Sequence, residues 1–213
     1  MTQAGPTVAA IVLAAGRSSR TAPLHKLLAP DATGLPMIAR TVRAITASRA
    51  DPVIVVLGHH AAGIRAAAST DAPTQKRIPQ FVTAPDHACG LSRTLVAGIR
   101  AACAHPGVAG ALVCLGDMPL IGTALIDRMI ETFLAHPDRP GVMPVHDGRR
   151  GNPILWSRAL FPALLTLAGD QGARHLLRQH GATMQQEAAG PEIAADFDTP
   201  ARLADFARCF TDG

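Results

Sequence analysis

Short, continuous runs of apolar residues alternate along this chain with segments in which apolar residues recur at helical spacing. The strongest apolar runs are Val8–Ala14, Val53–Leu57 and Ala109–Leu115, and each has the length of a buried strand. Two weaker runs, Pro79–Ala84 and Gly141–Val145, indicate further strands. Strands without polar alternation are typical of a mostly parallel sheet that is covered on both faces.

Helical patterns separate these strands. In each predicted helix, apolar residues recur three or four positions apart. These helices are Pro36–Ala47, His60–Ala68, Leu91–Cys103 and Thr123–His136. Thr123 is a candidate N-cap of the last of them. Strands that alternate with helices imply an α/β fold in which helices cover both faces of a mostly parallel sheet. No linker or repeat interrupts the pattern, so we expect residues 1–213 to form a single domain.

The pattern changes after Val145, and the final third predicts a small antiparallel addition to the sheet. A turn is expected over 147–152, followed by helices over Ser157–Leu167, with Ser157 as cap, and Ala173–His180. Two short antiparallel strands are expected over Met184–Glu187 and Glu192–Ala195. A last helix is expected to begin at Thr199–Pro200, because proline is favourable at the first helical position.

Ligands of parallel sheets bind beyond the carboxyl ends of the strands, near the point where the strand order reverses. The candidate binding segments therefore follow predicted strands: Ala15–Lys26, Gly58–His60, Ala84–Ser92 and Gly116–Leu120.

Composition and charge exclude several classes of function. Aromatic residues make up 3% of the 213 residues and tyrosine is absent, which disfavours a protein that stacks the bases of single-stranded nucleic acid. The net charge of +4 comes from basic residues spread along the chain, a distribution that fits a pocket for an anionic small molecule and argues against a nucleic-acid partner.

Features of membrane and secreted proteins are missing from the sequence. Val8–Ala15 is too short to span a bilayer, which takes about 20 residues. The four cysteines form no Cys-x-x-Cys pair, so we expect neither structural zinc nor a disulfide framework. Cys114 falls within a predicted strand and is expected in the core. Together these features predict a cytoplasmic protein without a membrane partner.

The stretch Thr7–Lys26 joins the first strand to a cationic loop. Ala15 and Gly16 break the apolar run, and the loop then carries two hydroxyls, two guanidinium groups and the Lys26 ammonium. It is neither a Walker loop nor the three-glycine dinucleotide fingerprint. Main-chain N–H groups and cations on such a loop suit a triphosphate and the charge of departing pyrophosphate. The alternative is an exposed basic loop.

Acidic residues stand at two further positions. Asp117 follows the third strong apolar run, with Gly116 leaving room for a ligand or metal at the backbone, and a carboxylate there is placed to hold Mg²⁺ against a phosphate. Asp196 and Asp198 alternate on an extended segment, so their side chains share one side and either is a candidate second ligand. The alternatives are caps: Asp117 for a turn and Asp198 for the last helix.

Two turns and two pairs of metal-binding residue types complete the candidates. Gly90–Thr94 leads into a helix with hydroxyls in its first turn, a place where anions bind. Arg149–Arg150 lies in a turn that is suited to a second phosphorylated substrate. Either can also be a plain loop. His59–His60 and His87–Cys89 lack a third ligand at suitable spacing, so zinc is not expected.

Six motifs occur in order along almost the whole chain. They are L-A-A-G-x-S-S-R at Leu13–Arg20 with Lys26, G-L-S at Gly90–Ser92, G-D-M-P at Gly116–Pro119, G-N-P at Gly151–Pro153, G-D-x-G-A-R at Gly169–Arg174 and D-x-D-T-P at Asp196–Pro200. With these motifs the chain resembles the MobA-like nucleotidyltransferases, and most closely the molybdenum cofactor cytidylyltransferases. The resemblance implies their Rossmann-like three-layer α/β/α fold.

The resemblance also implies a reaction. The terminal phosphate of molybdopterin attacks the α-phosphorus of CTP, which transfers CMP and displaces pyrophosphate. Mg²⁺ is the implied cofactor, with Mn²⁺ as an alternative, and a molybdoenzyme or its maturation chaperone is the implied recipient of the product. Ala14–Ala15 stands where guanylyltransferase relatives carry glycine at the third motif position, which favours cytosine over guanine.

The resemblance assigns roles to individual residues. The implied catalytic residues and metal ligands are Lys26, Arg20 and Asp117 for catalysis, and Asp117 and Asp198 for the metal. The implied acceptor-binding residues are Arg150, Asn152 and Arg174. The implied nucleotide-binding residues are Leu13, Ala14, Ala15, Gly16, Arg17, Ser18, Ser19, Gly90, Ser92 and Asp117.

The chain departs from the family pattern at three places. Thr21–Ala22 replaces the usual Met-Gly, Ser92–Thr94 replaces a serine-rich stretch, and Ala201–Arg202 replaces Glu-Asp. Two other functions therefore stay open: a module that binds nucleotide or cofactor for delivery without catalysis, and a related transferase that uses GTP or another phosphorylated acceptor.

Overall fold

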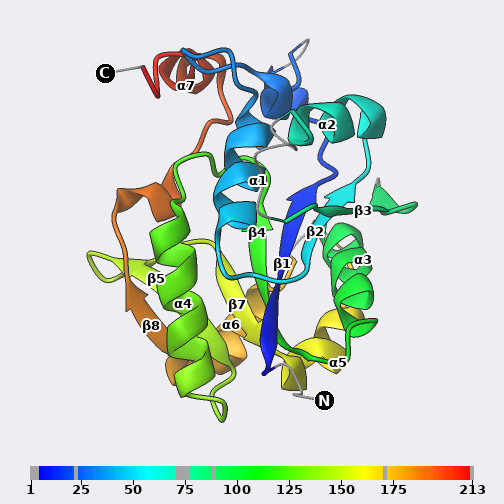
Figure 1. Cartoon of the computed structure of the whole chain (residues 1–213), viewed down its shortest axis with the longest axis vertical. Helices are drawn as coiled ribbons and strands as arrows, with labels where there is room; N and C mark the ends of the chain where they lie inside the picture. Colours follow the sequence, from blue (N-terminus) through cyan, green and yellow to red (C-terminus); the bar gives the residue numbers. More distant parts are fainter. Residues whose placement is uncertain (1–4, 22–23, 71–76, 88–89, 170–171, 212–213) are drawn as a thin grey trace.

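The computed structural model describes residues 5–21, 24–70, 77–87, 90–169 and 172–211, with the side chain of Ser19 left out (Figure 1). The strands are β1 (Thr7–Ala14), β2 (Val53–Leu57), β3 (Gln80–Thr83), β4 (Val108–Leu115), β5 (Gly141–His146), β6 (Arg149–Arg150), β7 (Ile154–Ser157) and β8 (Gln185–Ala188). The α-helices are α1 (Met37–Ala47), α2 (Ala61–Ala68), α3 (Leu91–Cys103), α4 (Thr123–Ala135), α5 (Phe161–Leu165), α6 (Arg174–His180) and α7 (Pro200–Phe206).

The described strands form one sheet in the order β3-β2-β1-β4-β7-β5-β6, with β8 beside β5. β3, β2, β1 and β4 run parallel, whereas β7 is antiparallel to both β4 and β5. The chain moves outward from β1 to β3 and then returns to place β4 on the other side of β1. The carboxyl ends of β1 and β4 therefore meet at the switch point where such sheets bind ligands.

Helices cover both faces of the sheet, as the uninterrupted apolar strands require (Figure 1). Side chains of a strand alternate between the faces. Ala14 accordingly lies in the core under α1, α2 and α4, whereas its neighbour Leu13 lies in the core under α3, α5 and α6. The expected three-layer α/β/α fold is confirmed.

A third, small core anchors the end of the chain. Phe197 packs with Leu203 and Phe206 of α7 against Met37 at the start of α1. The start of α7 is as expected, because the Thr199 hydroxyl accepts a hydrogen bond from the backbone N–H of Arg202 at 3.3 Å. This packing carries residues 196–198 to the same edge of the sheet as the end of β1.

The elements predicted before residue 146 all occur within one residue of their expected bounds. One predicted cap is wrong. Gly122 is the N-cap of α4, and the Thr123 hydroxyl instead donates to the carbonyl oxygen of Ala44 at 2.9 Å. Thr123 therefore ties α4 to α1 rather than capping its own helix.

The prediction for the C-terminal third is partly wrong. Its first expected strand forms β8, which pairs parallel with β5, and its second expected strand is a 3₁₀ turn over Pro191–Ala194. β6 and β7 supply the antiparallel part instead. Ser157 does cap the turn that follows β7, accepting from the backbone N–H of Ala159 at 3.3 Å, but α5 ends at Leu165.

No helix in the described ranges has the length and apolar character needed to cross a bilayer. Cys103, Cys114 and Cys209 carry free thiols, and Cys89 lies outside the described residues. Cys114 is buried in β4, as expected, and this burial raises the pKa of its thiol to about 12.

Candidate active site

The ends of β1 and β4 are tied together at the switch point. The Gly116 backbone N–H donates to the Leu13 carbonyl oxygen at 2.9 Å. A Cβ on Gly116 would lie 3.1 Å from that same oxygen and from Ile38 of α1. Glycine at this position therefore serves the close packing of β1, β4 and α1, and it also lines the cavity that borders the site. Asp117 follows directly and emerges at this edge.

The loop after β1 is folded by its own side chains. Ser18 has a left-handed backbone conformation with φ of 52°, which is uncommon for serine. The buried Thr21 hydroxyl lies within hydrogen-bond distance of two carbonyl oxygens, 3.0 Å from that of Ser18 and 2.9 Å from that of Leu24, and it donates its hydrogen to either of them. Thr21, which departs from the family pattern, therefore holds this loop closed. Ala22 lies outside the described residues.

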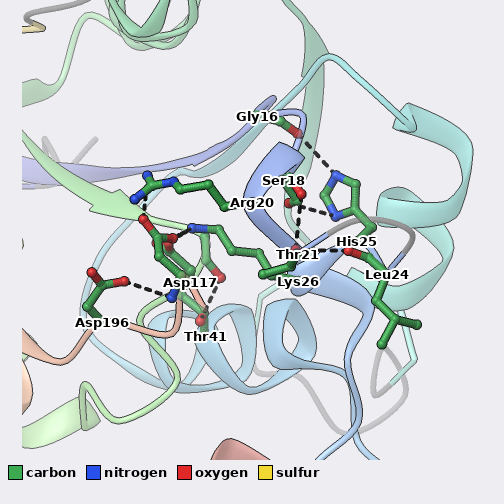
Figure 2. Close-up of polar contacts among 12 residues, drawn as sticks. Gly16, Ser18, Arg20, Thr21, Leu24, His25, Lys26, Thr41, Asp117 and Asp196 are labelled. Carbon is green, nitrogen blue, oxygen red and sulfur yellow. Dashed lines mark hydrogen bonds and ion pairs between the residues drawn. The ribbon is translucent and has the colours of Figure 1, made fainter. Parts of the chain in front are cut away.

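The Lys26 ammonium lies between carboxylates from distant parts of the chain (Figure 2). It donates hydrogen bonds to Asp117 and Asp198, and the Arg20 guanidinium contacts the other oxygen of Asp198 at 2.6 Å. The Lys26, Asp117 and Asp198 side chains are 18–20% exposed, whereas that of Arg20 is 74% exposed. Arg20 thus reaches a mostly buried ion cluster from the solvent.

These contacts keep the cluster charged. Burial disfavours the charged forms of Lys26 and Asp198, but their ion pairs outweigh it. The carboxylates raise the pKa of Lys26 above its ordinary value, and Lys26 together with Arg20 lowers the pKa of Asp198. Both groups are therefore ionised at neutral pH.

Asp196 and Asp198 have different positions. The Asp196 carboxylate accepts a hydrogen bond from the Asp198 backbone N–H at 2.9 Å, while the Asp198 side chain faces Lys26. Asp198 does not cap α7, because Thr199 does. Of the two candidate second ligands, Asp198 is the one that faces Asp117 across the ammonium.

A cavity of about 560 Å³ borders this cluster. The residues assigned to the nucleotide that line it are Leu13, Ala15, Gly16, Arg17, Ser18, Gly90 and Asp117. Ala14 does not line it, because its side chain points into the opposite core. Ser92 does not line it either, since it is fully buried, and its hydroxyl has no hydrogen-bond partner among the described residues. The side chain of Ser19 lies outside the described part of the chain.

Cations outnumber carboxylates in the walls of this cavity. Arg17, Arg20, Lys26 and Arg174 line it together with Asp117 and Asp198. Such a wall attracts a polyanion, and the mostly buried position of the central ions makes that attraction stronger than it is in bulk water.

A second cavity, of about 420 Å³, adjoins the first. The two cavities share wall residues, among them Leu13, Leu91 and Arg174. Trp156, which is 2% exposed, contributes to an apolar floor. All the residues assigned to the acceptor line this second cavity: Arg150, Asn152 and Arg174.

The sequence analysis missed several residues of the site. Trp156 and Arg178 line the second cavity, although the sequence around them carries no motif. His25 contacts the first loop through both ring nitrogens, 3.1 Å from the Gly16 carbonyl oxygen and 3.4 Å from Ser18 Oγ. A histidine before the motif lysine matches no pattern, so only the fold identifies its contacts.

The paired carboxylates fit a hard divalent cation. Asp117 and Asp198 direct oxygens toward one place, which the Lys26 ammonium bridges. Among the described residues, no group of three or more His, Cys, Asp or Glu side chains is arranged as a metal site. Two carboxylates are enough for Mg²⁺ or Mn²⁺ at a nucleotide, because phosphate oxygens and water complete the coordination.

Curated relatives share this region of the chain. The bifunctional protein GlmU of Pelobacter propionicus is 35% identical over 160 residues, which is 72% of this chain and 31% of that protein. The chain thus spans about a third of the length of that GlmU relative. The purine catabolism protein PucB of Bacillus subtilis is 29% identical over 202 residues, 92% of this chain and 93% of that protein.

A solved structure and a family model extend the comparison. Rv0371c from Mycobacterium tuberculosis H37Rv matches with a TM-score of 0.74 and 26% identity over 96% of this chain and 98% of that chain. A structure of the same protein in complex with manganese has a TM-score of 0.70. The family model of the MobA-like NTP transferase domain matches residues 10–184. Since this match covers most of the chain, the protein belongs to the family of MobA-like NTP transferase domains.

Proposed function

We propose that this protein transfers CMP from CTP to the terminal phosphate of a molybdopterin-type cofactor and releases pyrophosphate. The observation that carries the proposal is the Lys26–Asp117–Asp198 cluster, which borders one of two adjoining cavities at the switch point of the sheet. Membership of the NTP transferase family supports a nucleoside triphosphate as donor. The second cavity supports an acceptor that binds next to this nucleotide.

The first cavity suits the nucleotide. Arg17, Arg20 and Lys26 place cations along its wall for the triphosphate. A divalent ion held by Asp117 and Asp198, when bound, neutralises phosphate charge and orients the α-phosphate. The protein contributes the fixed positions of these groups, so little reorganisation is needed as charge develops on the departing pyrophosphate.

The Ala15 methyl supports cytosine as the base. Ala15 lines the first cavity, and a Cβ on Gly58 would lie only 2.5 Å from the Ala15 Cβ. The Gly58 backbone therefore lies close to the methyl, and this approach requires that Gly58 has no side chain. A fixed methyl at this wall favours a pyrimidine over a larger purine.

The second cavity suits an acceptor with a ring system and a phosphate. Its floor, which includes Trp156 and Ile154, is apolar, while Arg150 and Asn152 supply polar groups. Arg174 lines both cavities and is placed to hold the acceptor phosphate near the α-phosphate of the nucleotide. A dianionic phosphate needs no general base, because its second pKa is about 6.

The proposed step is an in-line displacement. An oxygen of the acceptor phosphate forms a bond to the α-phosphorus, and the bond from that phosphorus to the bridging oxygen of the β-phosphate breaks. The electron pair leaves with pyrophosphate. Lys26 and Arg20 lie at the cavity wall where they stabilise the charge of this leaving group.

A nucleotide panel tests the proposal. The purified protein is incubated with Mg²⁺ and CTP, GTP, ATP or UTP, either without acceptor, with molybdopterin or with another phosphorylated compound, and both nucleotide binding and pyrophosphate release are measured. We expect release that requires both CTP and acceptor. Release with GTP, or with another phosphorylated acceptor only, indicates the related transferase. Tight CTP binding without release under any acceptor indicates the delivery module.

A further inference from the structure

His25 lies behind the loop that lines the first cavity and contacts two of its residues (Figure 2). Its Nε2 is 3.1 Å from the Gly16 carbonyl oxygen, and its Nδ1 is 3.4 Å from Ser18 Oγ. Gly16 and Ser18 line the cavity, whereas His25 is not among the described residues that do. His25 therefore acts on a ligand of the cavity only through the loop.

The partners of His25 determine which ring nitrogen carries the hydrogen. A carbonyl oxygen only accepts, so Nε2 donates to Gly16. In the neutral ring, Nδ1 then has no hydrogen and accepts the hydroxyl hydrogen of Ser18. Ser18 has only this one hydrogen, so while His25 is neutral none remains for a phosphate oxygen, which can only accept.

The surroundings of His25 favour the neutral ring when the cavity holds no anion. Burial lowers the pKa of His25, and His60, His59 and Lys26 lower it further, against the Gly16 hydrogen bond that raises it. The His59 and His60 ring centroids lie 6.2 and 5.8 Å from that of His25. A polyanion beside Ser18 reverses this balance, because it attracts the charged imidazolium.

The geometry points to His25 as a positioning residue that takes up a proton when a triphosphate binds to the loop. This inference rests on the proposed function, which places a triphosphate there. In the protonated ring, Nδ1–H donates to Ser18 Oγ, and the Ser18 hydroxyl hydrogen turns to a phosphate oxygen. The proton comes from solvent, and no covalent bond to the ligand forms or breaks.

The sign of the pH dependence follows from linkage. Between the pKa of His25 in the free protein and its higher value in the complex, binding takes up as much as one proton, so affinity rises as pH falls through this window. Each unit by which binding raises the pKa corresponds to about tenfold in affinity.

Calorimetry of binding tests the inference on the intact protein. Mg²⁺–CTP and Mg²⁺–tripolyphosphate are titrated at pH 6, 7 and 8 in buffers of different ionisation enthalpy, which gives the number of protons taken up. His25→Gln keeps a donor for Gly16 but does not titrate. His136→Gln is the matched control, because His136 is exposed and its ring contacts the Thr132 carbonyl oxygen of α4, far from the loop.

We expect wild type and His136→Gln to take up as much as one proton more than His25→Gln, and to gain affinity toward pH 6 where His25→Gln does not. Ser18→Ala is expected to lose the same gain. Equal proton uptake by wild type and His25→Gln overturns the inference, as does failure of both probes to bind.

A measurement on the wild type alone covers the case in which His25→Gln does not fold. NMR titration of the His25 ring with and without Mg²⁺–tripolyphosphate is expected to show a raised pKa in the complex, and an unchanged or lowered pKa overturns the inference. Tripolyphosphate carries no base and needs no acceptor, so this result stands even if CTP is not turned over. If CTP is turned over but His25 takes up no proton, the inference about His25 is overturned and the proposed function is not.

Discussion

Lys26 and Asp198 are separated by 172 positions in the sequence, yet the Lys26 ammonium donates a hydrogen bond to the Asp198 carboxylate. The match to the family model ends at residue 184, so Asp198 comes from outside the matched range. The packing of Phe197 and α7 on Met37 brings this last segment to the site. Residues beyond the matched domain therefore complete the ion cluster.

The paired acidic residues of this segment give a matched comparison. We predict that Asp198→Asn weakens Mn²⁺ binding at least about tenfold and lowers turnover by roughly 100-fold. Asp196→Asn keeps both within about threefold, because an amide oxygen still accepts from the Asp198 backbone N–H. Mn²⁺ binding is followed by electron paramagnetic resonance and turnover by pyrophosphate release. Equal losses in the two variants contradict the assignment of Asp198 as the ligand.

The Lys26 ammonium lies between the two carboxylates that are proposed to hold the metal. We predict that Lys26→Met binds Mn²⁺ more tightly than wild type in the absence of nucleotide, since the competing cation is gone. Its turnover falls roughly 100- to 1000-fold, because the charge on departing pyrophosphate is no longer stabilised. Lys26→Arg, which keeps the charge, retains the weaker Mn²⁺ binding. Unchanged Mn²⁺ affinity in Lys26→Met argues against direct competition at this site.

Gly16 separates an effect on ligand binding from an effect on folding. A Cβ on Gly16 meets no atom within 4 Å, so we predict that Gly16→Ala changes the free energy of unfolding by no more than about 0.5 kcal/mol. The added methyl lies in the wall of the first cavity, and CTP affinity falls. Gly107→Ala is the control, because its Cβ is equally free but lies outside that wall. Calorimetry and urea denaturation measure the two quantities, and a loss of CTP affinity in both variants would rule out a local effect.

The Asp31 carboxylate is expected to contribute to the free energy of unfolding in a pH-dependent way. Its fully buried carboxylate is bonded by Arg40, and by Thr33 and Leu35. Burial alone raises the pKa of Asp31, but these partners together lower it. A lowered folded-state pKa means that the contribution is complete above the ordinary pKa of aspartate and is lost as pH falls through the lower value.

We therefore predict that Asp31→Asn costs about 3 kcal/mol in the free energy of unfolding at pH 7. The difference from wild type shrinks below about pH 4. Asp138→Asn, at a side chain that is 78% exposed, stays within about 0.5 kcal/mol. Urea denaturation between pH 3 and pH 8 measures these values. A difference that persists unchanged at pH 3 contradicts the account.

The sequence predicted elements whose signal is local. The run at Val53–Leu57 and the helical pattern at Leu91–Cys103 match their observed bounds, because burial on both faces or on one stripe leaves a clear period. β7 and the partner of β8 were not predicted. A four-residue strand carries little periodicity, and its pairing depends on contacts with β4 and β5 that are distant in sequence.

The site was predictable only where it rests on motifs. Asp117 follows a strand end, so its place at the edge of the sheet followed from the pattern. Ser92 was assigned by its motif, yet the fold buries its side chain away from the first cavity. Trp156 and His25 reach the site through strand pairing and loop folding, which no local pattern encodes.

Isotope tracing tests nucleotidyl transfer most directly. The protein is incubated with Mg²⁺, molybdopterin and CTP labelled with ³²P at either the α- or the γ-phosphate. We predict that the α-label appears in the acceptor product and the γ-label in pyrophosphate, and that Asp117→Asn abolishes both. Transfer of the γ-label to the acceptor, or recovery of all label in unchanged CTP, would contradict the proposed reaction.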